Sequence, residues 1–182
     1  TPARSRAEQI VSFSQPPDVA YAPHQVAAAT RATYSAFIGA GFAFATWASR
    51  IPQVRDHLDL TPAALGLVLL AIAGGSVCAL PISGLIIHRM NTRRTVTAMA
   101  VLVSVALVLA GCGYLAGVVP LVVGLFLFGF ANGAWDVAMN VQGADVERHL
   151  GKAIMPRFHA GYSLGTVAGA LLGAAMIALH VP

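Results

Sequence analysis

The sequence predicts an all-α membrane protein, a polytopic bundle of transmembrane helices. Hydrophobic residues make up 57% of the 182 residues and charged residues only 10%, whereas soluble domains average about 25% charged residues. The apolar residues gather in runs near the ~20 residues that a helix needs to cross a bilayer. These runs lack the period-two alternation of polar and apolar residues that marks the strands of a membrane barrel.

Five such runs follow a proline-containing N-terminal stretch. Arg50 and Pro52 end the first run, and Pro62 suits the first helical turn of the second. Pro81 is expected to kink the second span, and Pro120 divides an apolar run too long for one crossing. The predicted spans are approximately 32–49, 61–87, 95–118, 120–142 and 157–180. We expect residues 1–31 to form a disordered or loosely attached tail, and residues 32–182 the transmembrane domain.

The loops differ in their content of Lys and Arg, which predicts how the chain is oriented. The loop after the third span has no basic residue, and the loop after the first offsets its two arginines with two acids. Because basic loops stay on the cytoplasmic side, we expect a cytoplasmic N-terminus in a multi-pass protein of the cell (inner) membrane. The basic loops, after spans two and four, carry Arg89, Arg93 and Arg94, and Arg148, Lys152 and Arg157.

The fourth span carries a carboxylate between two amides. Asn132, Asp136 and Asn140 recur every four residues, so on a helix they share one face. No charged residue occurs from 95 to 135, and a charge within a span costs about 3 kcal/mol or more. Such a residue normally faces a bundle interior or a watery cavity, which indicates a transport pathway. The alternative is a structural polar contact that fixes helix packing.

Two chemistries are open to this stripe. The amides can bind hydroxyls of a polar solute, or they can satisfy the acid internally. If the apolar surroundings of Asp136 outweigh its hydrogen bonds, its carboxyl group can take up and release a proton, as in a proton-coupled carrier. Further candidates for the pathway lie within or at the start of other spans, each with a packing or interfacial role as its alternative: Trp47, Trp135 and His159.

The loop after the second span resembles the signature between helices two and three of the major facilitator superfamily. That signature is Gly, three residues, Asp, a basic residue, one residue, Gly, and then basic residues. Gly84, Arg89 and Arg93 match it, whereas His88 stands in place of the Asp and Asn91 in place of the second Gly. Segments 132–143, 146–148 and 154–165 resemble the YbjJ-type permeases, near the fucose-permease branch of that superfamily.

The resemblance implies a full protein of twelve helices in two halves. This chain would supply helices one to five, so its transmembrane domain would be incomplete and the C-terminal half would be a missing partner. The resemblance also implies a coupling acid at Asp136. The basic loop, with Arg94 beside the matching arginines, either anchors the chain at the membrane surface or gates the cytoplasmic side.

Glycines recur every four residues in the fifth span, at Gly161, Gly165, Gly169 and Gly173. Small residues at this spacing let helices approach closely, and we expect a packing face or a surface that moves during alternating access.

The sequence contains no nucleophile–base arrangement, P-loop or glycine-rich phosphate motif. The absence of these motifs from the sequence argues against an enzyme and against an ATP-driven pump.

The sequence thus predicts a secondary active transporter of a small polar solute, a sugar or related metabolite, that is coupled to protons. Its expected partners are the solute, protons and the lipid bilayer, with no nucleic acid, cofactor or metal. The alternative is a non-transporting membrane fragment or a scaffold subunit.

Overall fold

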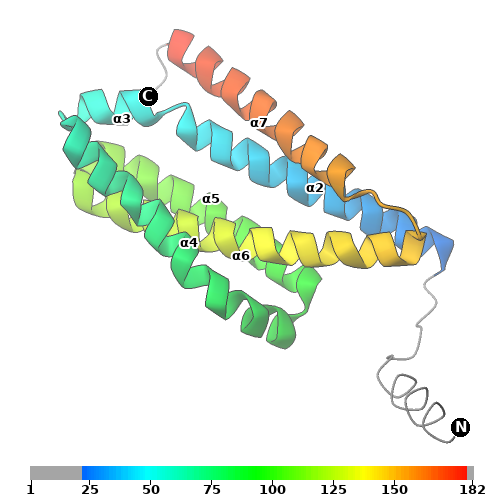
Figure 1. The fold of residues 1–182 in the computed structure, drawn as a ribbon. Helices are drawn as coiled ribbons and strands as arrows, with labels where there is room; N and C mark the ends of the chain where they lie inside the picture. The colour runs from blue at the N-terminus through cyan, green and yellow to red at the C-terminus, as the bar shows by residue number, and fades with distance from the viewer. Residues whose placement is uncertain (1–21, 180–182) are drawn as a thin grey trace, which may run out of the picture.

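A computed structural model describes residues 22–179, and in this range the chain is helical without any strand. The all-α bundle is therefore confirmed, while residues 1–21 of the predicted tail and residues 180–182 lie outside the described residues. Figure 1 labels the helices: α2 (Pro23–Ala48), α3 (Ile51–His57), α4 (Pro62–Met90), α5 (Thr92–Ala116), α6 (Val118–Leu150) and α7 (Met155–Ala178).

Four of the long helices, α4 to α7, are long and apolar enough to cross a membrane. Helix α2 is not among them, although its 26 residues make it as long as α5 and α7. It begins at Pro23 and therefore includes residues 23–31, which precede the predicted first span. Figure 1 shows α2 running alongside α7.

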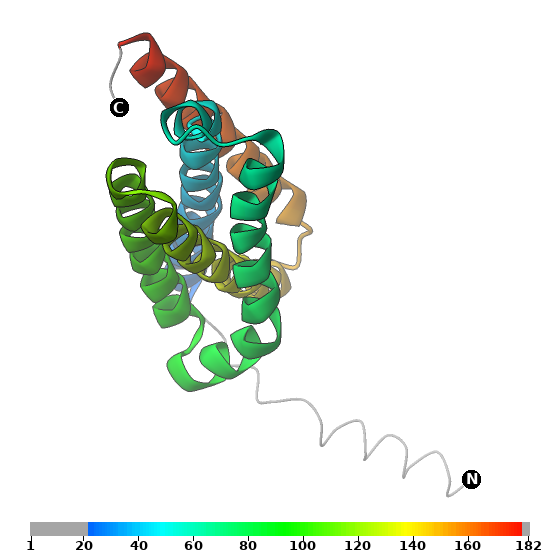
Figure 2. The same ribbon diagram turned by 90° about the vertical axis from the view of Figure 1, so that its left-hand side faces the viewer.

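The bundle is built from two groups of helices. Helix α6 packs against both α4 and α5, whereas α7 packs chiefly against α2. A smaller contact between α2 and α6 joins the two groups, as both views of the ribbon show (Figures 1 and 2). The largest fully buried hydrophobic side chains come from α2, α6 and α7 and include Phe37, Leu121, Leu125, Phe128 and Phe158.

Glycine lets the backbones of α4 and α6 touch. A Cβ added at Gly129 would overlap the carbonyl oxygen of Ile72, and one at Gly75 would overlap that of Phe126. Ser76 Oγ donates a hydrogen bond of 3.0 Å to the Gly129 carbonyl oxygen across the same contact. In a bilayer such close packing and interhelical hydrogen bonds hold helices together, because lipid tails are as apolar as the side chains.

One helix boundary differs from the one expected at a proline. The break between the third and fourth spans lies at Gly117, whose φ of 113° and ψ of −176° suit glycine, and Pro120 lies within the first turn of α6. Pro81 lies inside the continuous helix α4. The expected helix start at Pro62 is confirmed, with Thr61 Oγ1 accepting a hydrogen bond from Ala64 N at 3.2 Å.

The helix ends gather at two opposite ends of the bundle. At one end, the start of α2, the α4–α5 turn and the last turns of α6 line a cavity of about 350 Å³. At the other, the end of α2, the short helix α3 and the last turns of α5 line a cavity of about 190 Å³. His57 of α3 stacks on Tyr114 of α5 there, with ring centroids 3.9 Å apart. The two predicted basic loops thus follow helices that end on the same side.

Candidate functional site

The polar stripe of α6 centres on Asp136. Asn140 lies one turn further along and donates from Nδ2 to the Asp136 carbonyl oxygen at 2.9 Å and to its Oδ1 at 3.2 Å. Asp136 is exposed, whereas Trp135 and Met139 beside it are buried. Asp136 therefore lies on a side of α6 that the other described helices leave open, which is what a residue lining a pathway requires.

The two amides of the stripe differ in their contacts. Asn140 holds Asp136, but within residues 22–179 Asn132 makes no side-chain hydrogen bond to that carboxylate. Both amides are half-buried. The shared face predicted from the i, i+4 spacing therefore contains one bonded pair, Asp136 with Asn140, and a separate amide.

The first turns of α7 lie near this carboxylate. His159 and Tyr162 both interact electrostatically with Asp136. The His159 ring is exposed and meets the buried Phe37 of α2 edge-on, with ring centroids 5.1 Å apart. Sequence reasoning selected His159 but missed Tyr162, which lies three positions later and hence on the same side of the helix.

The two tryptophans do not join this polar face. Trp135 is 6% exposed and packs against α2, where a Cβ added at Gly39 would lie 3.7 Å from its ring. Trp47 is 7% exposed and lines the smaller cavity, together with Arg50. Both indole Nε1 atoms are buried and have no hydrogen-bond partner in the described part of the chain. The rings are thus enclosed by helices and offer no open aromatic face beside Asp136.

The basic loop is a tight turn centred on Asn91. Asn91 ends α4 and begins α5, and its Oδ1 accepts a hydrogen bond from Arg94 N at 3.0 Å. Its φ of 62° and ψ of 163° lie in a region that glycine normally occupies. The asparagine that replaces the signature's second glycine thus adopts a glycine-like backbone. The remaining signature residues include four exposed side chains and a glycine with open space around it: His88, Arg89, Arg93, Arg94 and Gly84.

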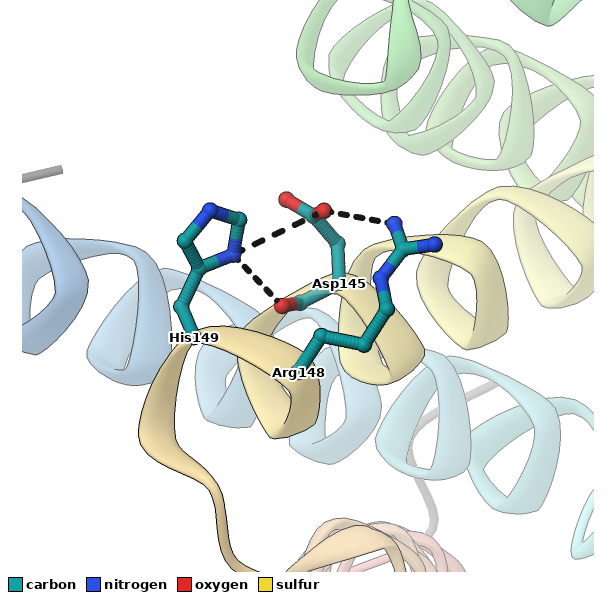
Figure 3. A network of polar contacts seen from close by, with 3 residues as sticks. All are labelled: Asp145, Arg148 and His149. Carbon is teal, nitrogen blue, oxygen red and sulfur yellow. Dashed lines mark hydrogen bonds and ion pairs between the residues drawn. The ribbon is translucent and has the colours of Figure 1, made fainter. Parts of the chain in front are cut away.

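A charged network lies at the same end, on the last turn of α6 (Figure 3). Arg148 Nη2 donates to Asp145 Oδ1 at 2.8 Å, and His149 Nδ1 lies 2.8 Å from the Asp145 carbonyl oxygen and 3.7 Å from its carboxylate. Asp145, His149 and Arg93 all line the larger cavity. This cavity therefore places a cation of the basic loop near an anion of α6.

Glu147 lies in segment 146–148, one of those that resemble the permeases, but the sequence does not indicate what its side chain binds. Its Oε1 accepts hydrogen bonds from the backbone N–H groups of Ile154 at 2.6 Å and Met155 at 2.7 Å. Contact between an acid and a backbone seven or eight positions later depends on how the intervening turn folds. No local spacing rule would have found it.

The glycines of α7 face α2. A Cβ added at Gly165 or Gly169 would overlap the carbonyl oxygen of Ile38 or Phe42. At Gly173 it would overlap the Ser49 side chain, and at Gly161 it would lie 3.4 Å from Ile38.

Among the residues described, no group of three or more His, Cys, Asp or Glu side chains could hold a metal ion.

Comparison with known proteins identifies the family of this chain. A family model described as Major Facilitator Superfamily matches residues 32–181. An uncharacterized transporter of Sinorhizobium fredii is 35% identical over 144 residues, which are 79% of this chain and 37% of that protein. An uncharacterized MFS-type transporter of Yersinia pestis is 34% identical over 138 residues, or 76% of this chain and 35% of the relative.

A third relative is the membrane protein MosC of Rhizobium meliloti, 34% identical over 140 residues, which are 77% of this chain and 34% of MosC. The chain thus spans about a third of the length of the curated relatives it matches. No solved structure matches it. With its helical, apolar bundle and a family match over most of its length, the chain belongs to the major facilitator superfamily.

Proposed function

We propose that this chain is part of a secondary active transporter that moves a small polar solute, a sugar or related metabolite, by alternating access. Protons drive the movement, and Asp136 is the proton site. One observation carries the proposal: an exposed carboxylate, bonded to Asn140, on a spanning helix that has no other charged residue before Asp145.

The Asp136 carboxylate would carry a large free-energy cost if it faced lipid. A charge facing lipid is expensive, by about 3 kcal/mol on insertion scales, so an acid within a span normally faces a cavity or another protein segment. The described helices leave Asp136 exposed. A second half of the protein, facing α6, would turn this open face into one wall of a solute pathway, since such sites form between repeats near the bilayer midplane.

The neighbouring groups have distinct roles in this proposal. Asn132 and Asn140 offer amides to solute hydroxyls, and His159 stands beside the proton site on α7. Membership of this superfamily makes transport the expected activity. We assign the chain to the YbjJ-type, fucose-permease-like branch of the superfamily. The protein lies in the inner membrane with its N-terminus in the cytoplasm. The basic loop of Arg89, Arg93 and Arg94 closes the cytoplasmic side of the solute pathway in one conformation of the transport cycle.

The test uses the full-length protein in proteoliposomes with an imposed pH gradient and a panel of labelled polar solutes. Wild-type protein should accumulate a solute, and Asp136→Asn should abolish accumulation while exchange of labelled for unlabelled solute continues. Asn keeps the size and much of the hydrogen bonding of Asp, but it does not titrate. If the variant accumulates solute with the wild-type pH dependence, Asp136 is a packing residue. If no polar solute binds or moves, the scaffold alternative stands.

A further inference from the structure

The turn between α6 and α7 contains a carboxylate clamp. Glu147 Oε1 accepts two backbone hydrogen bonds from the start of α7, from Ile154 at 2.6 Å and Met155 at 2.7 Å. Gly151 makes the turn possible because its φ of 60° and ψ of 25° are left-handed. An acid on the last turns of one helix thus binds the first N–H groups of the next.

This clamp satisfies groups that a helix start leaves without partners. The first N–H groups of any helix lack an intrahelical acceptor, and the N-cap residue of α7, Ile154, offers no side-chain cap. A carboxylate at this place also complements the positive end of the helix dipole. Bonds to an ionised acceptor are short and about twice as strong as neutral ones.

The clamp adds to one side-chain contact between α6 and the start of α7: a Cβ added at Gly143 of α6 would lie 2.9 Å from Met155 Cε and 3.3 Å from Phe158 Cδ2. Helix α7 packs chiefly on α2 and only slightly on α6. On the α2 side, Phe158 is fully buried, and its ring lies 5.6 Å from that of Phe37 and 4.7 Å from that of Tyr34. The start of α7 is therefore fixed to α2 by aromatic packing, and to α6 by the contact at Gly143 and by the hydrogen bonds of Glu147.

The position of that first turn decides where the next residues point. His159 directly follows Phe158, and Tyr162 lies one turn further along α7. Since an α-helix turns about 100° per residue, a shift of one residue at the start of α7 would rotate both side chains away from their present directions. Asp136 lies on α6, the same helix that carries Glu147.

We propose that Glu147 is a positioning residue: by bonding Ile154 and Met155 it sets the register of α7 against α6 and keeps His159 and Tyr162 within electrostatic range of Asp136. The hydrogen bonds of Glu147 to the start of α7, the local part of the proposal, are a property of the folded chain alone. Its consequence for proton coupling rests on the proposed function.

The local part is tested by hydrogen–deuterium exchange with mass spectrometry on the full-length protein. Glu147→Ala removes the acceptor, and exchange of the segment 154–158 should accelerate at least about tenfold, because hydrogen bonds to charged groups are among the stronger ones. Glu147→Gln keeps an Oε1 acceptor without charge and should give an intermediate rate. Asp145→Asn is the matched control, since this acid bonds Arg148 rather than α7, and it should leave segment 154–158 unchanged.

The positioning role is tested by the pH profile of proton-driven uptake. In Glu147→Ala the midpoint of the profile should shift, with Glu147→Gln between it and the wild type. A uniform loss of uptake at every pH would overturn the positioning role, as would wild-type exchange rates in segment 154–158 or equal effects from Asp145→Asn. The proposed function fails separately, through accumulation by Asp136→Asn, and in that case the exchange measurements still decide whether Glu147 clamps α7.

Discussion

Gly165 of α7 packs directly against the backbone of Ile38 in α2, and a Cβ added to this glycine would overlap the Ile38 carbonyl oxygen. A flexible side chain could move aside, but a helix carbonyl held in its own hydrogen bond cannot do so without shifting the helix. The contact therefore sets how closely α2 and α7 approach.

Replacing this glycine should destabilise the protein although alanine is the better helix former. An alanine in a helix interior is favoured over glycine by about 1 kcal/mol, but overpacking typically costs 1–3 kcal/mol. We expect Gly165→Ala to lower the melting temperature of the detergent-solubilised protein, and Gly165→Leu or Gly169→Leu to lower it or the expression level strongly.

Two controls match this prediction. Gly66 lies in α4 with nothing within 4 Å of an added Cβ, so Gly66→Ala should raise the melting temperature by its helix propensity. Leu171 of α7 is 66% exposed, so Leu171→Met should have little effect. Equal tolerance at Gly165 and Gly66 would show that α7 does not touch α2 at this point.

The turn at Asn91 predicts a stabilising change. A non-glycine residue in this backbone region costs on the order of 1–3 kcal/mol, while replacing an asparagine cap by glycine loses only a few tenths of a kcal/mol. The added glycine also loses more backbone entropy on folding, which costs about 0.5–1 kcal/mol. The net effect is that Asn91→Gly should be more stable than the wild type by about 1 kcal/mol. Thermal unfolding measures this. Asn91→Ala loses the cap and keeps the strain, so it should be less stable than the wild type.

The two amides of α6 should differ in their effect on proton-driven uptake. Asn132→Ala and Asn140→Ala should both weaken solute binding, because each removes an amide from the proposed pathway. Asn140→Ala also removes the hydrogen bond to the Asp136 carboxylate, so it alone should change the pH dependence of uptake. Solute affinity and uptake measured across a pH series separate these effects. Identical pH profiles for the two variants would contradict a role of Asn140 at the proton site.

Cysteine labelling tests the membrane orientation. In full-length protein in which every native cysteine, Cys78 and Cys112 included, is replaced by serine, an impermeant maleimide added to intact cells should label Asp56→Cys and spare Lys152→Cys. Asp56 lies in α3 with a side chain 65% exposed, and Lys152 is exposed in the α6–α7 turn. We avoid Gly117 as a probe because its φ of 113° would strain a cysteine. The reverse labelling pattern would invert the proposed orientation.

The sequence by itself determined the helical membrane bundle, the unusual position of Asp136 and the regular spacing of the α7 glycines. Each of these depends on composition or on a short periodicity, and both are properties of the chain before it folds. The signature loop could also be recognised locally, although its asparagine was expected to be a departure and proves to adopt the glycine-like conformation.

Only the tertiary structure decided which helix faces meet. It showed that Asn140 rather than Asn132 bonds Asp136, that both tryptophans are enclosed, and that Tyr162 lies near the proposed proton site. It also revealed the contact of Glu147 with the start of α7. These relationships depend on the rotation of each helix about its axis and on the path of each turn. Helices that are apolar on all sides have little preferred rotation of their own, so it is packing against neighbours, led here by glycine contacts, that fixes them.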